Sequence, residues 1–295
     1  MTDGTSQGLF VVIAIIIFGI FVGLAYTAFG DVLQPKMVNL FEEALDFKLD
    51  KGGSEETPDI PVEPEKAIYF ADENLEWTVR NVLKLKPDEI ITADKMKNLT
   101  ELKGSYFANV KNLMGLEYAV NLEIFDTNIS NPITDITPLA NLTNLKEINI
   151  KFANVKNLEP LKNLKNLEKL DLTSTNNAGD FSVLSNLTNL KELNLSQNNI
   201  TVITDISKLT KLEKLTLSYN QITDISILTN LTNLKYLDLS SQWNNTTYKT
   251  ISDIKPLYNL SNLEYLNLKT NGNIPESQIK YIQENSPKLT TLIQP

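Results

Sequence analysis

The side chains in this sequence that could do chemistry are carboxylates, lysines and tyrosines, because the 295 residues include no histidine and no cysteine. The missing histidine excludes Ser-His and Cys-His catalysis and metal sites with imidazole ligands. The missing cysteine excludes disulfides, thiolate nucleophiles and iron–sulfur clusters. The sequence also contains no G-x-x-x-x-G-K, G-x-S-x-G or H-E-x-x-H motif. We therefore predict that the protein is not an enzyme and has no catalytic residues, metal or cofactor.

The distribution of charge argues against nucleic acid as a partner. The formal net charge is -9, and residues 1–65 account for most of it with 3 Lys and 11 Asp or Glu. The rest of the chain is nearly neutral, and its lysines are scattered singly among acids. Because a nucleic-acid-binding protein needs a basic footprint, this pattern favours other partners.

The carboxylates, lysines and tyrosines must be positioned by elements that a recurring leucine pattern predicts along residues 96–274. The pattern is visible in NLTNLKEINI, NLKNLEKLDL, NLTNLKELNL and their later copies. The repeats begin 22 or 23 residues apart, with one spacing of 29, at Met96, Ala119, Leu142, Leu164, Leu187, Leu209, Leu231 and Leu260. A period in this range with L-x-x-L-x-x-L-x-L is the leucine-rich repeat signature, which predicts an α/β solenoid of the 22-residue type.

The repeat that begins at Leu187 shows what one coil should look like. Leu187 and Leu190 fill the interior at a corner, and Leu193 and Leu195 alternate with outward residues as in a short parallel strand. No coil can bury its leucines alone, so we expect the coils to stack and each end to carry a cap. We predict a helical amino-terminal cap at 66–95, with Leu75, Val79, Val82 and Leu83 on one face of a helix over 72–85. The predicted carboxyl-terminal cap is 275–295, with a helix over 275–284.

An asparagine ladder is expected where each strand ends. Asn198, Asn220 and Asn271 occupy the same repeat position, where an interior side-chain amide can bond backbone groups that the turn leaves free. Ala153, Thr175 and Gln242 depart from this pattern. We expect the ladder to be interrupted at those coils and their turns to be held less tightly.

The outward positions of the strands define columns of side chains across the stack. The fifth position after each start holds Glu101, Ile124, Glu147, Lys169, Glu192, Lys214, Tyr236 and Tyr265, and the seventh holds Lys103, Asp126, Asn149, Asp171, Asn194, Thr216, Asp238 and Asn267. Because neighbouring coils lie about 5 Å apart, the aspartates of the seventh column are too far apart to share a metal ion.

Exposed aromatic residues are the usual anchors of protein interfaces. We predict a protein-binding patch of Tyr219, Tyr236 and Tyr265, with Phe152 as an outlying contact. The alternative is that these are ordinary surface tyrosines packed on their neighbours. A second signal is the insert SSQWNNTTYKT in the 29-residue repeat, because insertions map to loops that often adjoin a binding face. Its Trp243 either folds back on the convex side or is offered to the partner.

The first 65 residues predict a membrane anchor and a linker. After a short tail at 1–8, residues 9–29 carry no charge, and their 21 residues would form a helix of about 31 Å, the thickness of the hydrocarbon layer. A cleaved signal peptide ending near Ala28-Phe29-Gly30 is the alternative. Gly19 and Gly23 form a G-x-x-x-G that could serve transmembrane dimerisation. Residues 30–65 should be an amphipathic segment followed by an acidic, extended linker.

Residues 66–295 resemble the internalin family of leucine-rich-repeat proteins from Gram-positive bacteria. The resemblance is carried by FADENLEWTVRNVLKL, IITADKMKNLTEL, VKNLMGLEYAVNLEIF and the recurring DITPLANL and DIKPLYNL. It implies a curved right-handed rod with 3₁₀ segments on the convex side and strands on the concave side, which binds a protein partner there after export to the cell surface. The sequence has no L-P-x-T-G sorting signal, so the amino-terminal helix is expected to be the anchor instead.

Two functional hypotheses follow from these features. The first is a single-pass cell-membrane protein whose repeats, outside the cell, recognise a protein partner on the concave face, either membrane-proximal or within the envelope. The second is a structural scaffold that dimerises through its transmembrane helix, with the solenoid either outside the cell or in the cytoplasm. Lys36, Lys48 and Lys51 follow the span and no Lys or Arg precedes it, which by the positive-inside rule gives some support to a cytoplasmic solenoid.

Overall fold

The computed structural model describes residues 66–104, 107, 109–127, 132–175, 180–203, 206–243, 250–272 and 274–295. The predicted anchor at 9–29, the Gly19 and Gly23 pair and the linker at 30–65 lie outside these residues. Among the described helices, none is both long and apolar enough to cross a bilayer.

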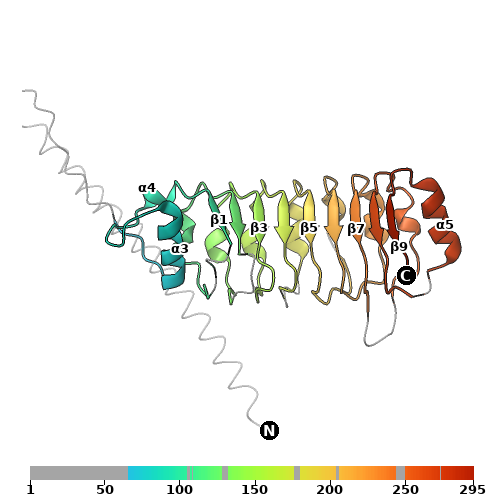
Figure 1. Cartoon of the computed structure of the whole chain (residues 1–295), viewed down its shortest axis with the longest axis horizontal. Coiled ribbons are helices and arrows are strands. Elements are labelled where there is room, and N and C mark those ends of the chain that lie inside the picture. Colours follow the sequence, from blue (N-terminus) through green and yellow to red (C-terminus); the bar gives the residue numbers. More distant parts are fainter. Residues whose placement is uncertain are drawn as a thin grey trace, which may run out of the picture. The chain divides into compact units, whose positions relative to one another are not determined.

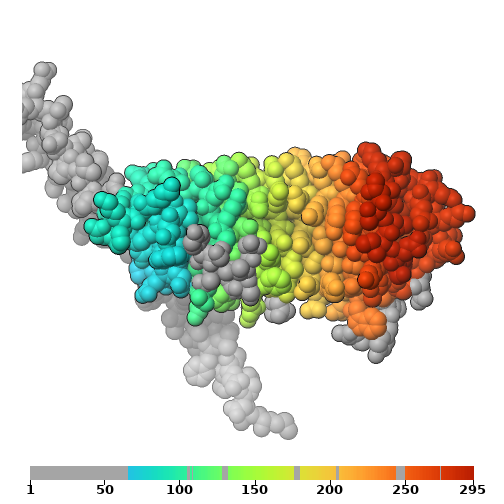
Figure 2. All heavy atoms as spheres, in the orientation of Figure 1, coloured from blue at the N-terminus to red at the C-terminus, as the bar shows by residue number. Residues whose placement is uncertain are grey.

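The described residues form one parallel sheet of nine strands in sequence order, which confirms the leucine-rich-repeat solenoid (Figure 1). The strands are β1 (Glu101–Lys103), β2 (Ile124–Asp126), β3 (Glu147–Asn149), β4 (Lys169–Asp171), β5 (Glu192–Asn194), β6 (Lys214–Thr216), β7 (Tyr236–Asp238), β8 (Tyr265–Asn267) and β9 (Thr291–Ile293). Each pairs only with its neighbours in the chain. Figure 2 shows the coils from the front cap to the orange region following one another in sequence order.

Each strand needs only three residues, because a single inward side chain per strand joins the core. The middle residue, such as Leu193 in β5, points inward and is almost fully buried, while its two neighbours point outward. Burying one such leucine stabilises the fold by about 2 kcal/mol, and stacking repeats this gain coil after coil. The result is a single core that runs through the whole described solenoid.

On the other side of the core each coil returns through a 3₁₀ segment. These are η3 (Leu116–Tyr118), η4 (Thr137–Leu139), η5 (Glu159–Leu161), η6 (Ser182–Asn186), η7 (Ile206–Lys208), η8 (Ser226–Asn230) and η9 (Lys255–Leu257). The structure explains why D-I-x-P-L recurs in the sequence. Asp135 Oδ1 accepts the N–H of Thr137 at 2.8 Å, and Pro138 stands in the first turn of η4, where no N–H is needed.

The interior amide ladder is present, and one of its predicted interruptions is wrong. Asn220 Oδ1 accepts the N–H groups of Asn198 and Ile200, both at 3.0 Å, and its Nδ2 donates to two carbonyls of its own and the preceding coil. Gln242 continues the ladder, because its longer side chain still accepts from Ile222 N–H at 3.0 Å and donates to Leu217 O at 2.7 Å.

Two further members of this column differ in what they contribute. Thr175 retains part of the pattern, since its Oγ1 bonds Leu172 O and Asn198 Oδ1. Ala153 has no side-chain group to contribute, so the ladder does stop at that coil. The turns at Thr175 and Gln242 are therefore hydrogen-bonded, although their residue types depart from asparagine.

Helices close both ends of the stack. At the front, α3 (Glu73–Leu83) and the short α4 (Ala93–Met96) precede β1, and at the rear α5 (Glu276–Asn285) precedes β9. The front helix ends two residues earlier than the predicted Leu85, because Lys84 adopts a left-handed conformation that terminates it. Val82, predicted to face inward, is exposed. In α5, which lies within the predicted carboxyl-terminal cap, Ile279 and Ile282 are both buried.

Asp72 joins the front cap to the first coils. Its Oδ1 accepts the N–H groups of Asn74 and Leu75 and so caps α3, while Oδ2 accepts those of Lys111 and Asn112. Burial, the largest single influence, would raise the pKa of Asp72, but the backbone N–H donors together outweigh it and hold the pKa below its usual value. The ionised carboxylate therefore links the front cap to the first coils through its hydrogen bonds.

Candidate interaction surface

The strand register aligns the two predicted columns on the outward face of the sheet. In the fifth column Glu147, Lys169, Glu192, Lys214, Tyr236 and Tyr265 follow one another across β3–β8. The pairing of Tyr236 with Tyr265 shows that β7 and β8, on either side of the long insert, keep the register of the other coils. The surface therefore has a charged part, over β3–β6, and an aromatic part, over β7 and β8.

The charged part is largely neutralised by its own residues. The residues just before the strands, at the fourth repeat position, alternate in sign, and Lys146–Glu123, Lys191–Glu168 and Lys235–Glu213 form ion pairs of 2.8, 2.8 and 2.6 Å. In the fifth column, Lys169 pairs with Glu192 at 3.0 Å, and this hydrogen-bonded ion pair raises the pKa of Lys169. Because opposite charges alternate both along and across the coils, the face has no strong net field to select a partner by charge sign alone.

The aromatic part is a stacked pair. The rings of Tyr236 and Tyr265 lie 4.3 Å apart between centroids and nearly parallel at 3°, and the ammonium of Lys214 lies 5.2 Å from the Tyr236 centroid. Burial raises the pKa of Tyr236 to about 12, with further contributions from Tyr265 and Asp238. Both tyrosines are half-buried. The pair thus offers hydroxyls and ring edges, since its inner ring faces are occupied by stacking.

Tyr219 and Trp243 are the more exposed aromatics, at 61% and 52% of their full accessible surface. They lie beyond the carboxyl ends of β6 and β7, on adjacent coils. Their backbones run side by side, because Trp243 N–H donates to the carbonyl of Asn220 at 2.8 Å. The backbone of Trp243, which the sequence left between two placements, therefore lies where the strands end, next to the backbone that follows Tyr219.

The predicted patch is thus two groups rather than one. In the described part of the chain, no ring contact or hydrogen bond joins the side chain of Tyr219 to Tyr236 or Tyr265. Tyr219 belongs to the rim with Trp243, and the stacked pair belongs to the sheet face. Phe152 is exposed on the same rim, but three coils away from Tyr219, about 14 Å at the usual strand spacing.

A common backbone turn presents the rim residues. Phe152, Ser174, Gln197, Tyr219, Ser241 and Thr270 all have a left-handed backbone, with φ between 50° and 61°. In the first five of these, the N–H donates to a carbonyl of the next coil at 2.7–3.1 Å. These bonds hold a conformation that is unfavourable for residues other than glycine. The turn therefore points each of these side chains away from the coil in a fixed direction.

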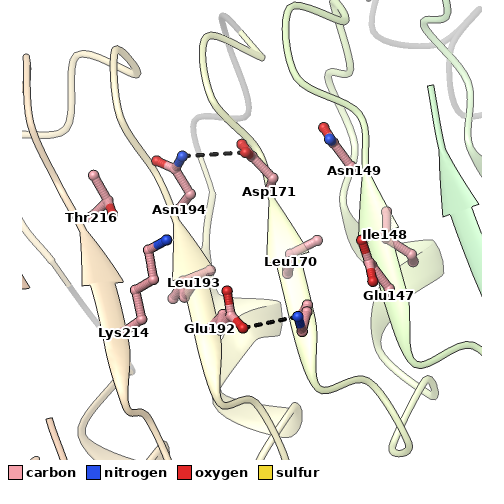
Figure 3. Close-up of a pocket in the computed structure, with 11 residues that line it drawn as sticks. Glu147, Ile148, Asn149, Leu170, Asp171, Glu192, Leu193, Asn194, Lys214 and Thr216 are labelled. Carbon is pink, nitrogen blue, oxygen red and sulfur yellow. Dashed lines mark hydrogen bonds and ion pairs between the residues drawn. The ribbon is translucent and has the colours of Figure 1, made fainter. Parts of the chain in front are cut away.

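A shallow groove of about 190 Å³ lies between the fifth and seventh columns over β3–β6 (Figure 3). The seventh column forms its other wall, and its acids and amides mainly cap their own strands. Asp171 Oδ1 accepts the N–H and the hydroxyl of Thr173 at 2.8 and 2.6 Å, and Asn194 does the same for Ser196. This turn chemistry explains why Asp and Asn recur at this position. Across the described residues, no group of three or more side chains has metal-ligand geometry.

The sequence analysis missed a second asparagine ladder, on the solvent side. The second Asn of each N-L-x-N-L donates from Nδ2 to a carbonyl of the preceding coil, as Asn144 does to Val120 O and Asn233 to Thr210 O, both at 2.8–2.9 Å. The signal was visible in the sequence, because this Asn recurs as regularly as the leucines beside it.

Comparisons with known proteins agree with this architecture. The family described as leucine-rich repeats (two copies) matches residues 188–230 and 210–251. An internalin, InlF, from Listeria monocytogenes is 30% identical with a TM-score of 0.61, over 76% of this chain and 68% of that protein. Internalin C2 from the same organism is 29% identical with a TM-score of 0.67, over 77% of this chain and 94% of that protein. No curated protein sequence matches significantly.

Proposed function

The chain belongs to the internalin-like family of leucine-rich-repeat proteins, and from this premise we propose that it binds a protein partner through the outward sheet face and the adjoining rim. Leucine-rich-repeat domains generally mediate binding between proteins, and their stacked coils create extended binding surfaces. The protein is accordingly a binding protein and not an enzyme.

The observation that carries the proposal is the exposed pair Tyr219 and Trp243 on adjacent coils. Tryptophan and tyrosine are enriched at the energetic centres of protein interfaces, where they insert into pockets of the partner. Here both side chains are more than half exposed, yet their backbones are fixed by hydrogen bonds between coils. A partner would gain apolar contact area without first having to order these residues.

The other aromatic residues take supporting roles in this proposal. Tyr236 and Tyr265 on the sheet face offer hydroxyl groups for hydrogen bonds, and the raised pKa of Tyr236 keeps its hydroxyl neutral. Phe152 extends the same rim toward the front cap and would contact only a partner long enough to span three coils.

Photo-crosslinking in living cells tests this surface directly. A photoreactive phenylalanine analogue at Tyr219 should give a crosslinked partner band, whereas the same analogue at Lys162, directly after η5 on the opposite side of the core, should not. Tyr219→Ser with Trp243→Ser should then weaken binding of the crosslinked partner by at least tenfold. A partner that crosslinks equally from both positions, or whose affinity the double variant leaves unchanged, would remove the rim from consideration.

We propose further that residues 9–29 tether this binding domain to the cell membrane, with the repeats outside. The support is the uncharged 21-residue span in the sequence. Residues 31–65 reach at most about 120 Å when fully extended, which favours a membrane-proximal or envelope partner. A reporter enzyme active only outside the cell, fused after Pro295, should be active. An inactive but folded reporter would place the repeats in the cytoplasm and support the scaffold hypothesis.

A further inference from the structure

The groove in Figure 3 has a regular division between its centre and its ends. In the centre, on β4 and β5, Lys169 pairs with Glu192, and Asn194 Nδ2 donates to Asp171 Oδ2 at 3.2 Å. At the ends, on β3 and β6, the corresponding residues are Glu147 with Asn149 and Lys214 with Thr216. In each column, the two central residues are thus bonded to each other.

The end residues keep their binding capacity. Within the described residues, the Glu147 carboxylate has no cation within ion-pair distance, and the only bond of the Asn149 side chain is from Lys151 N–H to Oδ1 at 3.3 Å, so Nδ2 is available. Lys214 has no paired carboxylate there, and its ammonium rests on the Tyr236 ring. The Thr216 hydroxyl has no described partner. Each end therefore offers one unpaired charge and one neutral polar group.

The distance between the two ends selects a particular ligand geometry. Three strand steps separate β3 from β6, which is about 14 Å at the usual spacing. An extended chain advances about 3.4 Å per residue, so its residues i and i+4 are also about 14 Å apart and project to the same side. A helix is about 10 Å across, wider than the space between two columns on one sheet face, so it could not enter this groove.

We propose that this groove binds an extended segment of the protein partner that carries opposite charges four residues apart. A basic residue of the segment contacts Glu147 and Asn149, and an acidic residue contacts Lys214 and Thr216. The residue between them faces the internally satisfied Lys169–Glu192 pair and is uncharged. This inference rests on the proposed function, because it names the chemistry of the partner for the same sheet face.

Charge order gives the groove its selectivity. A segment of the right spacing but with two like charges meets repulsion at one end, and a spacing of three or five sends the second charge to the opposite side of the extended chain. Exposed ion pairs are individually weak, so reversing both end charges should change affinity for a matched segment by about tenfold. The effect is therefore one of selectivity within a larger interface that the rim aromatics anchor.

Selection from a displayed library of random twelve-residue peptides tests the proposal on the full chain in detergent micelles. The native chain should enrich peptides with a basic and an acidic residue four positions apart, in one predominant order, over spacings of three and five. Glu147→Lys with Lys214→Glu should enrich the same spacing in the reverse order. The matched control is Glu159→Lys with Lys162→Glu, which reverses an exposed ion pair of 3.7 Å in η5 and should leave the enriched motif unchanged.

The outcomes separate this inference from the function on which it rests. Enrichment with no preferred charge spacing, or a preferred order that the reversed variant retains, overturns the groove proposal. If in addition the enriched peptides are lost on Tyr219→Ser with Trp243→Ser, the binding surface stands and only the groove assignment falls. If neither set of substitutions changes the selected peptides, both proposals fall.

Discussion

Replacing Asn220 by alanine should be among the most damaging single changes in the solenoid. Its buried side chain makes four bonds of 2.8–3.0 Å, to Asn198 N–H, Ile200 N–H, Leu195 O and Leu217 O. In the alanine variant Leu217 O keeps its bond from Gln242 Nε2, but the other three backbone groups are left without this partner in the interior. At about 1 kcal/mol or more for each buried group, the loss should be about 3 to 4 kcal/mol.

Asn271 provides a matched comparison at the same repeat position. It is equally buried, but its Nδ2 bonds only Leu239 O and Leu268 O, and its Oδ1 is a buried acceptor with no hydrogen-bond partner. Asn271→Ala should therefore cost about half as much, near 2 kcal/mol. Asn233→Ala, which removes one exposed bond to Thr210 O, should cost no more than about 1 kcal/mol.

Urea unfolding followed by circular dichroism ranks the three variants by their loss of stability. Amide hydrogen exchange shows which coils are destabilised. Asn220→Ala should accelerate exchange of the Asn198 and Ile200 amides more than those of distant coils. Because coils can unfold separately, the local exchange is the sharper measurement. A loss for Asn220→Ala no greater than that for Asn271→Ala would refute the argument that the number of satisfied backbone groups determines the cost.

Three further predictions concern the cap and the rim. Asp72→Ala should destabilise the front cap by about 2 to 3 kcal/mol in urea unfolding. Because the folded pKa of Asp72 lies below the ordinary 3.8, its stabilisation is complete above pH 4 and is lost as the pH falls through the lowered value, so Asp72→Asn should flatten this part of the acid-unfolding profile. Gly115→Ala should destabilise more than Gly104→Ala in thermal melts, since both have positive φ but a methyl group at Gly115 would lie 2.7 Å from the Phe70 ring, whereas Gly104 faces open space. Tyr219→Asn should leave unfolding unchanged or stabilise by up to about 1 kcal/mol, because Asn tolerates the left-handed backbone, while lowering partner affinity; a loss of stability above 1 kcal/mol would show that Tyr219 is a structural residue.

The strands and their register could be predicted from the sequence because two periods agree. The repeat period places equivalent residues of successive coils side by side, and the strand period of two separates inward from outward residues. Together they placed Glu147 beside Lys169 and Tyr236 beside Tyr265, as the structure shows. The seven extra residues of the long repeat did not disturb this, since a slip by one residue would expose Leu266 of β8.

What could not be predicted is how outward side chains divide their bonds among themselves. Lys169 could have paired with Glu147 or Glu192, and the choice of Glu192 is what leaves Glu147 unpaired. A column of residue types contains no information on that choice, because it depends on rotamers and on the neighbouring column. The same reason explains the error over Gln242, whose longer side chain reaches the acceptors and donors that asparagine reaches in other coils.

At the rim, one backbone turn both links neighbouring coils and directs a side chain toward solvent. The left-handed turn is held by a hydrogen bond to the next coil, so any residue that follows the strand is directed outward whatever its type. Selection for folding alone would favour glycine or asparagine there. Phe152 and Tyr219 satisfy no described side-chain bond at this position and carry the conformational cost of a bulky residue. The proposed binding of a partner at this rim would give both aromatic residues a role that compensates for this cost.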